Sequence, residues 1–275
     1  MTINCNGTLI DLSVPKVMGI LNVTPNSFYD GGKHREINSI IHQVDKMLSE
    51  GADFIDIGAY SSKPSAEFVS ELEEIERLKV VVKELINTFP NIVLSVDTFR
   101  AAVAKVAVEH GVAIVNDISA GLLDQKMLPT VAELKVPYIM MHMRGNPQTM
   151  QSMTKYDDIV KEITFYFSER IQKARSFGIS DIIIDPGFGF AKTVEQNYEV
   201  LNKMEVFSML ELPLLAGVSR KSMIYKVLET TPQEALNGTT ALNTIALQKG
   251  AKILRVHDVK EAVECIKLVS KLNVI

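Results

Sequence analysis

The sequence predicts an α/β protein in which eight parallel strands, each followed by a helix, close into a (β/α)8 TIM barrel. Short β-branched apolar runs alternate with longer amphipathic stretches from one end of the chain to the other. No proline-, glycine- or serine-rich linker divides the 275 residues. Because one such barrel takes about 250 residues, we expect a single domain over residues 1–275.

The first element is expected to be a β-hairpin over residues 2–13. Isoleucine and leucine alternate with other residues there around Asn6 and Gly7, the dipeptide that favours a tight two-residue turn. Because this segment precedes the first barrel strand, we expect the hairpin to cover the bottom of the barrel, where the strands begin.

Eight strand candidates follow, each short and almost continuously apolar, as is typical of parallel strands buried on both faces. They occupy residues 16–23, 54–58, 93–97, 113–116, 138–142, 182–185, 214–218 and 253–257. Helical patterns lie between them, and four begin with capping residues and stop before a glycine, the residue preferred just past a helix end. Those four cover residues 38–50, 98–110, 157–177 and 240–249.

Composition excludes several classes of protein. Apolar residues make up 47% of the chain and charged residues 23%, which is typical of a globular protein with a substantial core. A net charge of −4 without a lysine- or arginine-rich block argues against nucleic acid as a partner. No apolar stretch has the roughly 18 residues of a membrane span, and residues 1–6 lack a signal-peptide layout, so we expect a cytoplasmic protein without membrane contact.

Polar residues close nearly every predicted strand, at the barrel end where active sites are built. For a single member a helix cap is an equal alternative, as for Asp97 before Thr98. Capping does not require carboxylates, asparagines, histidines and an arginine together on one rim. In chain order the rim residues are Asn22, Asp56, Asp97, Asn116, His142, Asp185, Ser219, Arg255 and His257.

The residue types of this rim indicate the ligand. Carboxylate and amide oxygens accept hydrogen bonds from an NH-rich ring, whereas lysine, arginine and histidine suit phosphate groups. The usual glycine-rich nucleotide-binding motifs are missing. The sequence therefore predicts a ligand with an NH-rich heterocycle and an anionic tail.

Three loops after the strands have unusual lengths or compositions. Residues 22–32 carry two aromatic residues between proline and glycine and are typical of a lid. Residues 58–65 place hydroxyl groups beside Lys63, which fits either a phosphate contact or an ordinary polar turn. Residues 217–222 place Arg220 and Lys221 at a predicted helix start, which favours a bound anion.

Taken together, these segments resemble the dihydropteroate synthase family, the folate-pathway enzymes that sulfonamide drugs target, from about Lys16 to the C-terminus. The matching segments are GILNVTP (19–25), DGG (30–32), DIG (56–58), SVDT (95–98), NDI (116–118), MHM (141–143), DPGFGF (185–190), SRKS (219–222) and RVHDV (255–259).

The resemblance implies that the amine of 4-aminobenzoate displaces pyrophosphate from 6-hydroxymethyl-7,8-dihydropterin diphosphate, giving 7,8-dihydropteroate with the help of Mg2+. It also implies sulfonamide inhibitors and a homodimer. The catalytic residues that it implies are Asp97, Asp185, Lys221 and Arg255, with Asn22 on the metal. The substrate-binding residues that it implies are Phe28, Ser62, Lys63, Pro64, Asn116, Ile118, Met141, Phe190, Gly217, Arg220, Ser222 and His257.

Within this set the resemblance divides the roles. Asp97, Asn116, Asp185 and Lys221 hold the pterin ring, and Met141 and Phe190 pack near it. Arg255, His257 and the Ser62 hydroxyl hold the diphosphate, whereas Phe28, Ser62, Pro64, Lys221 and Ser222 form the aminobenzoate pocket.

Four positions depart from the family pattern: Asn26, Ser62, Lys63 and Ser65 stand where aspartate, threonine, arginine and glycine are usual. Lysine replaces a bidentate guanidinium fork by a point charge, so we expect a modestly weaker hold on phosphate.

Three alternatives stay open on the sequence. A pterin-binding barrel of the methyltransferase type would share the aspartate and asparagine contacts, but it has no reason to keep the cationic segments 219–222 and 255–257. A non-catalytic pterin-binding protein would bind without releasing pyrophosphate. A barrel that binds another phosphorylated substrate is the third.

Overall fold

The computed structural model describes residues 1–23, 33–60 and 69–272. Eight strands close a barrel in the order β10-β3-β4-β5-β6-β7-β8-β9, and every neighbouring pair runs parallel. The predicted (β/α)8 fold is confirmed. The strands are β3 (Lys16–Asn22), β4 (Phe54–Gly58), β5 (Leu94–Asp97), β6 (Ile114–Asp117), β7 (Tyr138–Met141), β8 (Ile182–Asp185), β9 (Leu214–Ala216) and β10 (Ala251–Val256).

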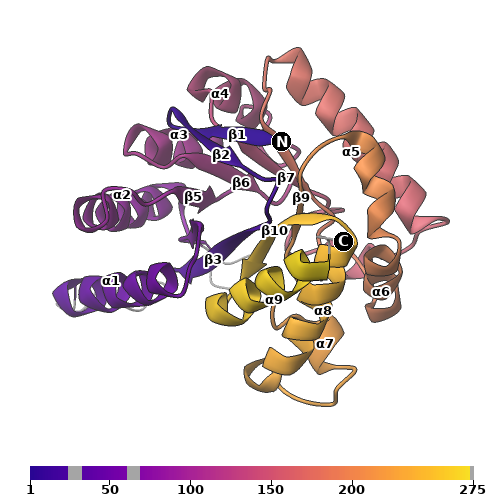
Figure 1. Ribbon diagram of the computed structural model, residues 1–275. Helices are drawn as coiled ribbons and strands as arrows, with labels where there is room; N and C mark the ends of the chain where they lie inside the picture. Colours follow the sequence, from indigo (N-terminus) through magenta and orange to yellow (C-terminus); the bar gives the residue numbers. More distant parts are fainter. Residues whose placement is uncertain (24–32, 61–68, 273–275) are drawn as a thin grey trace.

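The helices form a ring outside the barrel (Figure 1). Outward-facing strand residues such as Ile55, Val96 and Leu254 pack against this ring and form the larger hydrophobic core. The helices are α1 (Lys33–Ser49), α2 (Glu71–Thr88), α3 (Ala101–Glu109), α4 (Met127–Leu134), α5 (Ile159–Ser176), α6 (Val194–Asn202), α7 (Ser222–Tyr225), α8 (Leu236–Gln248) and α9 (Val259–Leu272), with short 3-10 helices at Met150–Ser152, Met204–Leu210 and Pro232–Glu234.

The predicted hairpin is confirmed. Strands β1 (Thr2–Cys5) and β2 (Thr8–Asp11) pair antiparallel, and Asn6 and Gly7 turn between them with φ of 51° and 86°. Figure 1 shows the hairpin lying across one end of the barrel. Ile3, Cys5 and Leu12 pack there against inward-facing residues near the strand starts, so the hairpin closes the bottom with apolar contacts.

The barrel interior has two layers of different character. Side chains two apart on a strand point to the same face, so each strand contributes to both layers. The lower layer is apolar and packs under the hairpin. The upper layer is polar and its side chains hydrogen-bond to one another. The lower and upper partners are Phe54 and Asp56 on β4, Ile114 and Asn116 on β6, Ile183 and Asp185 on β8, and Ile253 and Arg255 on β10.

Three predicted helix starts were wrong. The helix expected from 38 begins five residues earlier, at Lys33. The helix expected from 98 begins at Ala101, and its N-cap, Arg100, makes no side-chain capping bond. The helix expected from 240 begins at Leu236 and runs through Gly238. A Cβ on Gly238 would lie 2.3 Å from Ile224 Cγ2. This glycine therefore permits close packing against α7 and does not break the helix.

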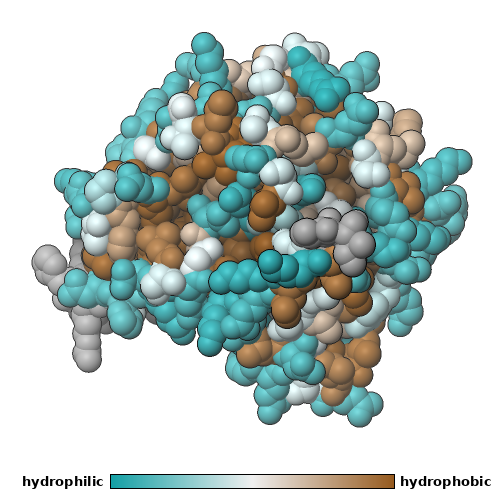
Figure 2. All heavy atoms as spheres, viewed as in Figure 1, coloured by the Kyte–Doolittle hydropathy of each residue, from teal (hydrophilic) through white to brown (hydrophobic). Residues whose placement is uncertain are grey.

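Membrane-spanning helices are absent from the described residues, since none of those helices is both long enough and apolar enough. The face seen in Figure 2 carries hydrophilic side chains around most of its outline, with hydrophobic side chains visible between the helices.

Candidate active site

A network of buried charges spans the upper layer of the barrel. Asp56 Oδ2 accepts hydrogen bonds from Asn116 Nδ2 at 2.9 Å and from Arg255 Nε at 2.6 Å. Arg255 Nη2 donates to Asp97 Oδ2 at 2.6 Å. The guanidinium therefore bridges two carboxylates, and residues from β4, β5, β6 and β10 are joined in one network.

Three of the predicted catalytic residues converge around Gly217. A Cβ on Gly217 would lie 3.7 Å from Lys221 Nζ, 3.9 Å from Arg255 Cβ and 4.0 Å from Asp185 Oδ2. These three side chains come from the ends of β8 and β10 and from the loop after β9. The Asp185 carboxylate and the Lys221 ammonium group therefore lie beside Gly217 together with the base of the Arg255 side chain, whose guanidinium extends to Asp56 and Asp97.

Asn22 extends the site toward solvent. A Cβ on Gly58 would lie 3.7 Å from both Asn22 Oδ1 and Asp97 Cβ. Asn22 is exposed, whereas Asn116 is buried. The Asn22 amide oxygen therefore stands at the open mouth of the site, beside the buried network.

An apolar wall borders the charged groups. Ile118 and Met141 belong to a small hydrophobic cluster at this end of the barrel, and the Phe190 ring packs against it. Lys221 Nζ lies 4.9 Å from the centre of that ring. A flat ring with polar edges would find both apolar contact and hydrogen-bonding groups here.

Burial shifts the pKa values of three groups in the site. Burial raises the pKa of Asp97 to about 7, although the Arg255 charge opposes the shift. Burial also raises the pKa of Asp185 above its usual range, against the charge of Lys221. The pKa of Lys221 falls to about 8 because burial outweighs the attraction of Asp185. Such shifts are typical of functional sites.

His257 is neutral at pH 7, because burial of its ring, and next the nearby Arg255 charge, lower its pKa to about 4. Ser219 Oγ accepts a hydrogen bond from His257 N at 3.1 Å and lies 2.9 Å from Nδ1. In the tautomer in which the Ser219 hydroxyl donates to Nδ1, the ring carries its own hydrogen on Nε2, where it can donate to an anion.

Arg220 is not brought into this cluster. Its Nε and Nη2 donate to Asp258 at 2.9 and 2.8 Å, and Nη1 donates to the carbonyl oxygens of Pro232 and Gln233. These bonds tie the loop after β9 to the segment after β10. Ser222, also predicted to bind substrate, is the first residue of α7 and is half-buried.

Part of the predicted site falls outside the described residues. Phe28, Ser62, Lys63 and Pro64 belong to this part, as do the departures at Asn26 and Ser65. Their roles stay predictions.

Asp56 was predicted on the rim without a role of its own. The structure shows it fully buried and bonded to Asn116 and Arg255. A carboxylate inside the apolar run FIDIG is the signal that points to it. His142 was also predicted on the rim, but it is buried against Tyr166 of α5 and does not join the network of buried charges.

The capping alternative for Asp97 is excluded. The helix that follows begins three residues later than capping would need, and the Asp97 carboxylate bonds to Arg255 instead. Asp97 thus belongs to the charged network of the upper layer.

Comparison with known proteins agrees with this geometry. Residues 18–257 match the family of pterin binding enzymes. The dihydropteroate synthase of Escherichia coli is 43% identical over 271 residues, which cover 98% of this chain and 95% of that protein.

Solved structures extend the likeness to the whole fold. A Yersinia pestis dihydropteroate synthase in complex with a sulfonamide drug superposes with a TM-score of 0.93 at 41% identity, over all of both chains. The Xanthomonas albilineans dihydropteroate synthase in complex with 7,8-dihydropteroate superposes with a TM-score of 0.87 at 33% identity, over 100% of this chain and 99% of that one. This chain therefore belongs to the pterin binding enzymes and, within them, to the dihydropteroate synthase family.

Proposed function

We propose that this chain condenses 6-hydroxymethyl-7,8-dihydropterin diphosphate with 4-aminobenzoate, releasing pyrophosphate and 7,8-dihydropteroate. The observation that carries this proposal is the convergence of Asp185, Lys221 and Arg255 around Gly217. Acceptors for an NH-rich ring and cations for a diphosphate meet there within one site.

The pterin ring would occupy the inner part of the site. Asp97, Asn116 and Asp185 would accept hydrogen bonds from its amine and amide groups, and Lys221 would donate to a ring oxygen or nitrogen. The ring faces would pack against the apolar wall of Ile118, Met141 and Phe190. Arg255 would keep Asp97 oriented, because it already binds that carboxylate.

The diphosphate would lie toward the mouth of the site. Arg255 and His257 would donate to its oxygens, joined by Ser62 and Lys63 from the second loop. His257 would act as a neutral donor through Nε2, since its pKa lies well below 7. Arg255 would carry a full charge, because Asp56 and Asp97 more than offset the burial of its guanidinium.

Asn22 fits a role as a magnesium ligand. Mg2+ prefers oxygen ligands, keeps several waters and is often held by few protein groups together with substrate phosphates. The described residues contain no group of three histidine, cysteine, aspartate or glutamate side chains that would form a complete cage. The exposed Asn22 oxygen would therefore share the ion with the diphosphate, where Mg2+ would neutralise charge on the leaving group.

The chemical step needs no strong base. The lone pair of the arylamine forms a bond to the pterin methylene carbon, the C–O bond breaks, and its electron pair leaves with pyrophosphate. The amine then loses a proton to solvent. Arg255 and His257 would stabilise the growing charge on pyrophosphate more strongly in the transition state than in the bound substrate. If bond breaking leads, Asp97 and Asp185 would stabilise positive charge on the methylene.

The second substrate would enter from the loop side. Phe28, Ser62 and Pro64 would line the aminobenzoate pocket together with Lys221 and Ser222. Sulfonamides would compete there. We also propose a homodimer, which sedimentation of the purified protein tests directly.

The test is pyrophosphate release from the dihydropterin diphosphate, measured with and without Mg2+ and with and without 4-aminobenzoate. We expect release that needs both the metal and the amine. Tight binding of the dihydropterin diphosphate in calorimetry without any release would contradict the proposal and favour a non-catalytic pterin-binding protein.

A further inference from the structure

Lys192 is a buried lysine that the proposed reaction does not use, and burial lowers the pKa of its ammonium group to about 7. It lies in the loop between β8 and α6, and only 6% of it is exposed. Its Nζ lies 2.9 Å from Gly187 O, 3.1 Å from Phe190 O and 3.1 Å from His142 Nδ1. Among the described residues no carboxylate oxygen lies within ion-pair distance of this ammonium group. Its contacts are therefore those of a clamp on backbone carbonyls.

We propose that Lys192 is a positioning residue of the pterin subsite, which fixes the turn from Gly187 to Phe190 against the end of β7. The inference rests on the proposed function, because it assigns the pterin ring to the wall that Phe190 helps to form. Lys192 touches neither substrate in this proposal, and it affects pterin binding by holding the turn in place.

The turn has little freedom on the side facing β7. Gly187 has φ of 71°, and a Cβ there would lie 2.1 Å from His142 O. Phe190 N donates to Gly187 O at 3.1 Å, which closes the turn. Gly189 N donates to Asn197 Oδ1 of α6 at 2.7 Å. The backbone is thus seated closely, and its outward carbonyls need donors.

Two lysines supply those donors. Lys192 binds the carbonyls of Gly187 and Phe190, whereas Lys221 Nζ donates to Phe188 O at 2.5 Å. Lys221 also stands over the Phe190 ring. Loss of the Lys192 contacts would therefore shift both the ring that packs on the pterin and the carbonyl that orients Lys221.

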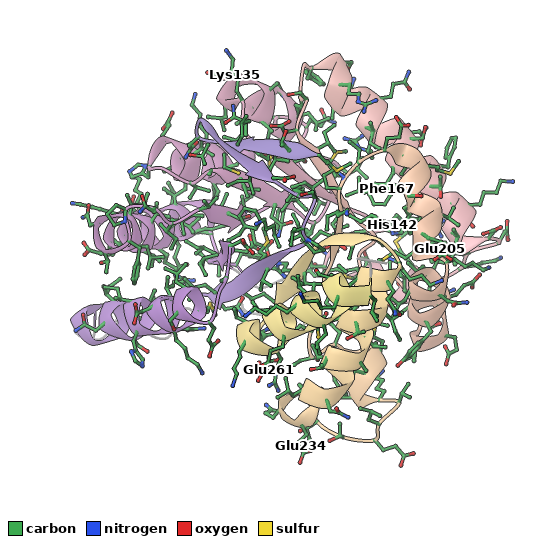
Figure 3. The ribbon with its side chains drawn as sticks, viewed as in Figure 1. Lys135, His142, Phe167, Glu205, Glu234 and Glu261 are labelled. Carbon is green, nitrogen blue, oxygen red and sulfur yellow. The ribbon has the colours of Figure 1, made fainter. Side chains whose placement is uncertain are left out.

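His142 completes the clamp. Figure 3 labels this residue on the side of the barrel covered by α5 and α6, and its ring packs edge-on against Tyr166 at 4.8 Å between centroids. With His142 Nδ1 as an acceptor, the three hydrogens of the ammonium group match its three acceptors. The compact three-donor geometry explains why lysine suits this place, whereas the planar fork of arginine does not.

The test compares Lys192→Met with a matched control, Lys203→Met. Methionine keeps the length and apolar stem of lysine and removes its three donors, while Lys203 is an exposed lysine paired with Glu199. Calorimetry measures the affinity for the dihydropterin diphosphate, and steady-state turnover measures the Michaelis constant for the aminobenzoate substrate. Hydrogen exchange of the Phe190 amide in the free protein reports on the turn itself.

For Lys192→Met we expect pterin binding that is about ten- to hundredfold weaker, as for loss of bonds to a charged donor. The Michaelis constant for the aminobenzoate should change less than the pterin affinity, because Lys221 is the one described residue of that pocket that the turn orients. The Phe190 amide should exchange faster while helix amides keep their protection. Lys203→Met should match the wild type throughout. A general loss of stability would instead speed exchange everywhere.

Lys192→Gln is measured alongside as a second variant. Its amide supplies two donors to the buried acceptors, so it can be studied even where the methionine variant does not fold. A folded variant without the ammonium group that binds the pterin as tightly as the wild type, with the same Phe190 exchange, overturns the inference. Failure of the wild type to release pyrophosphate would overturn the proposed function instead, and the exchange result in free protein would still decide whether Lys192 holds the turn.

Discussion

The two layers inside the barrel come from the same strands and do different work. Phe54 and Ile183 of the lower layer are fully buried and pack beneath the hairpin. Two residues further along the same strands, Asp56 and Asp185 are buried in the upper layer as carboxylates. A step of two residues therefore separates apolar groups that stabilise the fold from carboxylates of the layer that we propose to serve the substrate.

Burial contributes to the free energy of folding with opposite sign in the two layers. Full burial of a large apolar side chain stabilises the fold by about 1.5–3 kcal/mol. In the upper layer, Asp56 Oδ1 is buried without a hydrogen-bond partner among the described residues, and burial raises the pKa of Asp97 and Asp185. Such groups oppose folding unless partners compensate. Substitutions in the two layers should therefore change different measured quantities.

The largest effect is expected for Arg255→Met. Turnover should fall by about 10²–10³-fold, as for loss of one stabilising donor in a transition state. The free energy of unfolding should also fall by about 3 kcal/mol, because Asp56 and Asp97 lose their shared cation. Steady-state pyrophosphate release and denaturant unfolding measure the two quantities.

The double variant Arg255→Met/Asp56→Asn separates these effects. It removes one of the stranded charges, so stability should recover in part while turnover stays low. Recovery of turnover along with stability would mean that Arg255 acts only on the fold.

In the lower layer, Phe54→Ala should lower the free energy of unfolding by about 3–5 kcal/mol, through lost burial and the cavity left behind. The folded protein should bind the dihydropterin diphosphate as the wild type does. Denaturant unfolding measures stability, and calorimetry well below the unfolding midpoint measures binding. Equal loss of affinity here and in the upper layer would erase the distinction between the layers.

Pterin affinity should depend on pH in both directions. As pH falls through about 7, Asp97 is protonated and loses an acceptor, since its pKa is raised. As pH rises through about 8, Lys221 loses its proton, since its pKa is lowered. Each limb should approach about a tenfold change per pH unit. Calorimetry over a pH range that brackets both pKa values checks this, and Lys221→Met should remove the alkaline limb.

The smallest effect on turnover is expected for Arg220→Lys. Arg220 is engaged by Asp258 and two carbonyls, so the change should lower stability by about 1 kcal/mol with turnover nearly that of the wild type. Thermal unfolding and pyrophosphate release test it. A large rise in the Michaelis constant for either substrate would place Arg220 in the binding site, as the sequence resemblance implied.

Much of this could be predicted from the sequence because local patterns determine it. The turn at Asn6 and Gly7 specified the hairpin, and the apolar runs located all eight strands with small errors at their ends. The rule that parallel strands end at one edge was enough to bring Asp97, Asn116, Asp185 and Arg255 together.

Contacts between distant segments could not be predicted in this way. Asp56 meets Arg255 across 199 positions, and Arg220 meets Asp258 across 38. Neither pairing has a local signal. The start of α8 was missed because Gly238 suggests a break, whereas its role is close packing. The direction of His142 was available from alternation, since Met141 shares the inward face of β7 with Ile139 and the next residue must point outward.

The most direct test of the account changes one residue in each layer of the same strand. Pyrophosphate release and pterin binding are compared for Asp185→Asn and Ile183→Val. We predict that Asp185→Asn lowers kcat/KM by about 10²-fold with little loss of stability, while Ile183→Val keeps kcat/KM and lowers the free energy of unfolding by about 1 kcal/mol. Wild-type turnover in Asp185→Asn, or an equal loss in both variants, would contradict the assignment of the upper layer to the reaction.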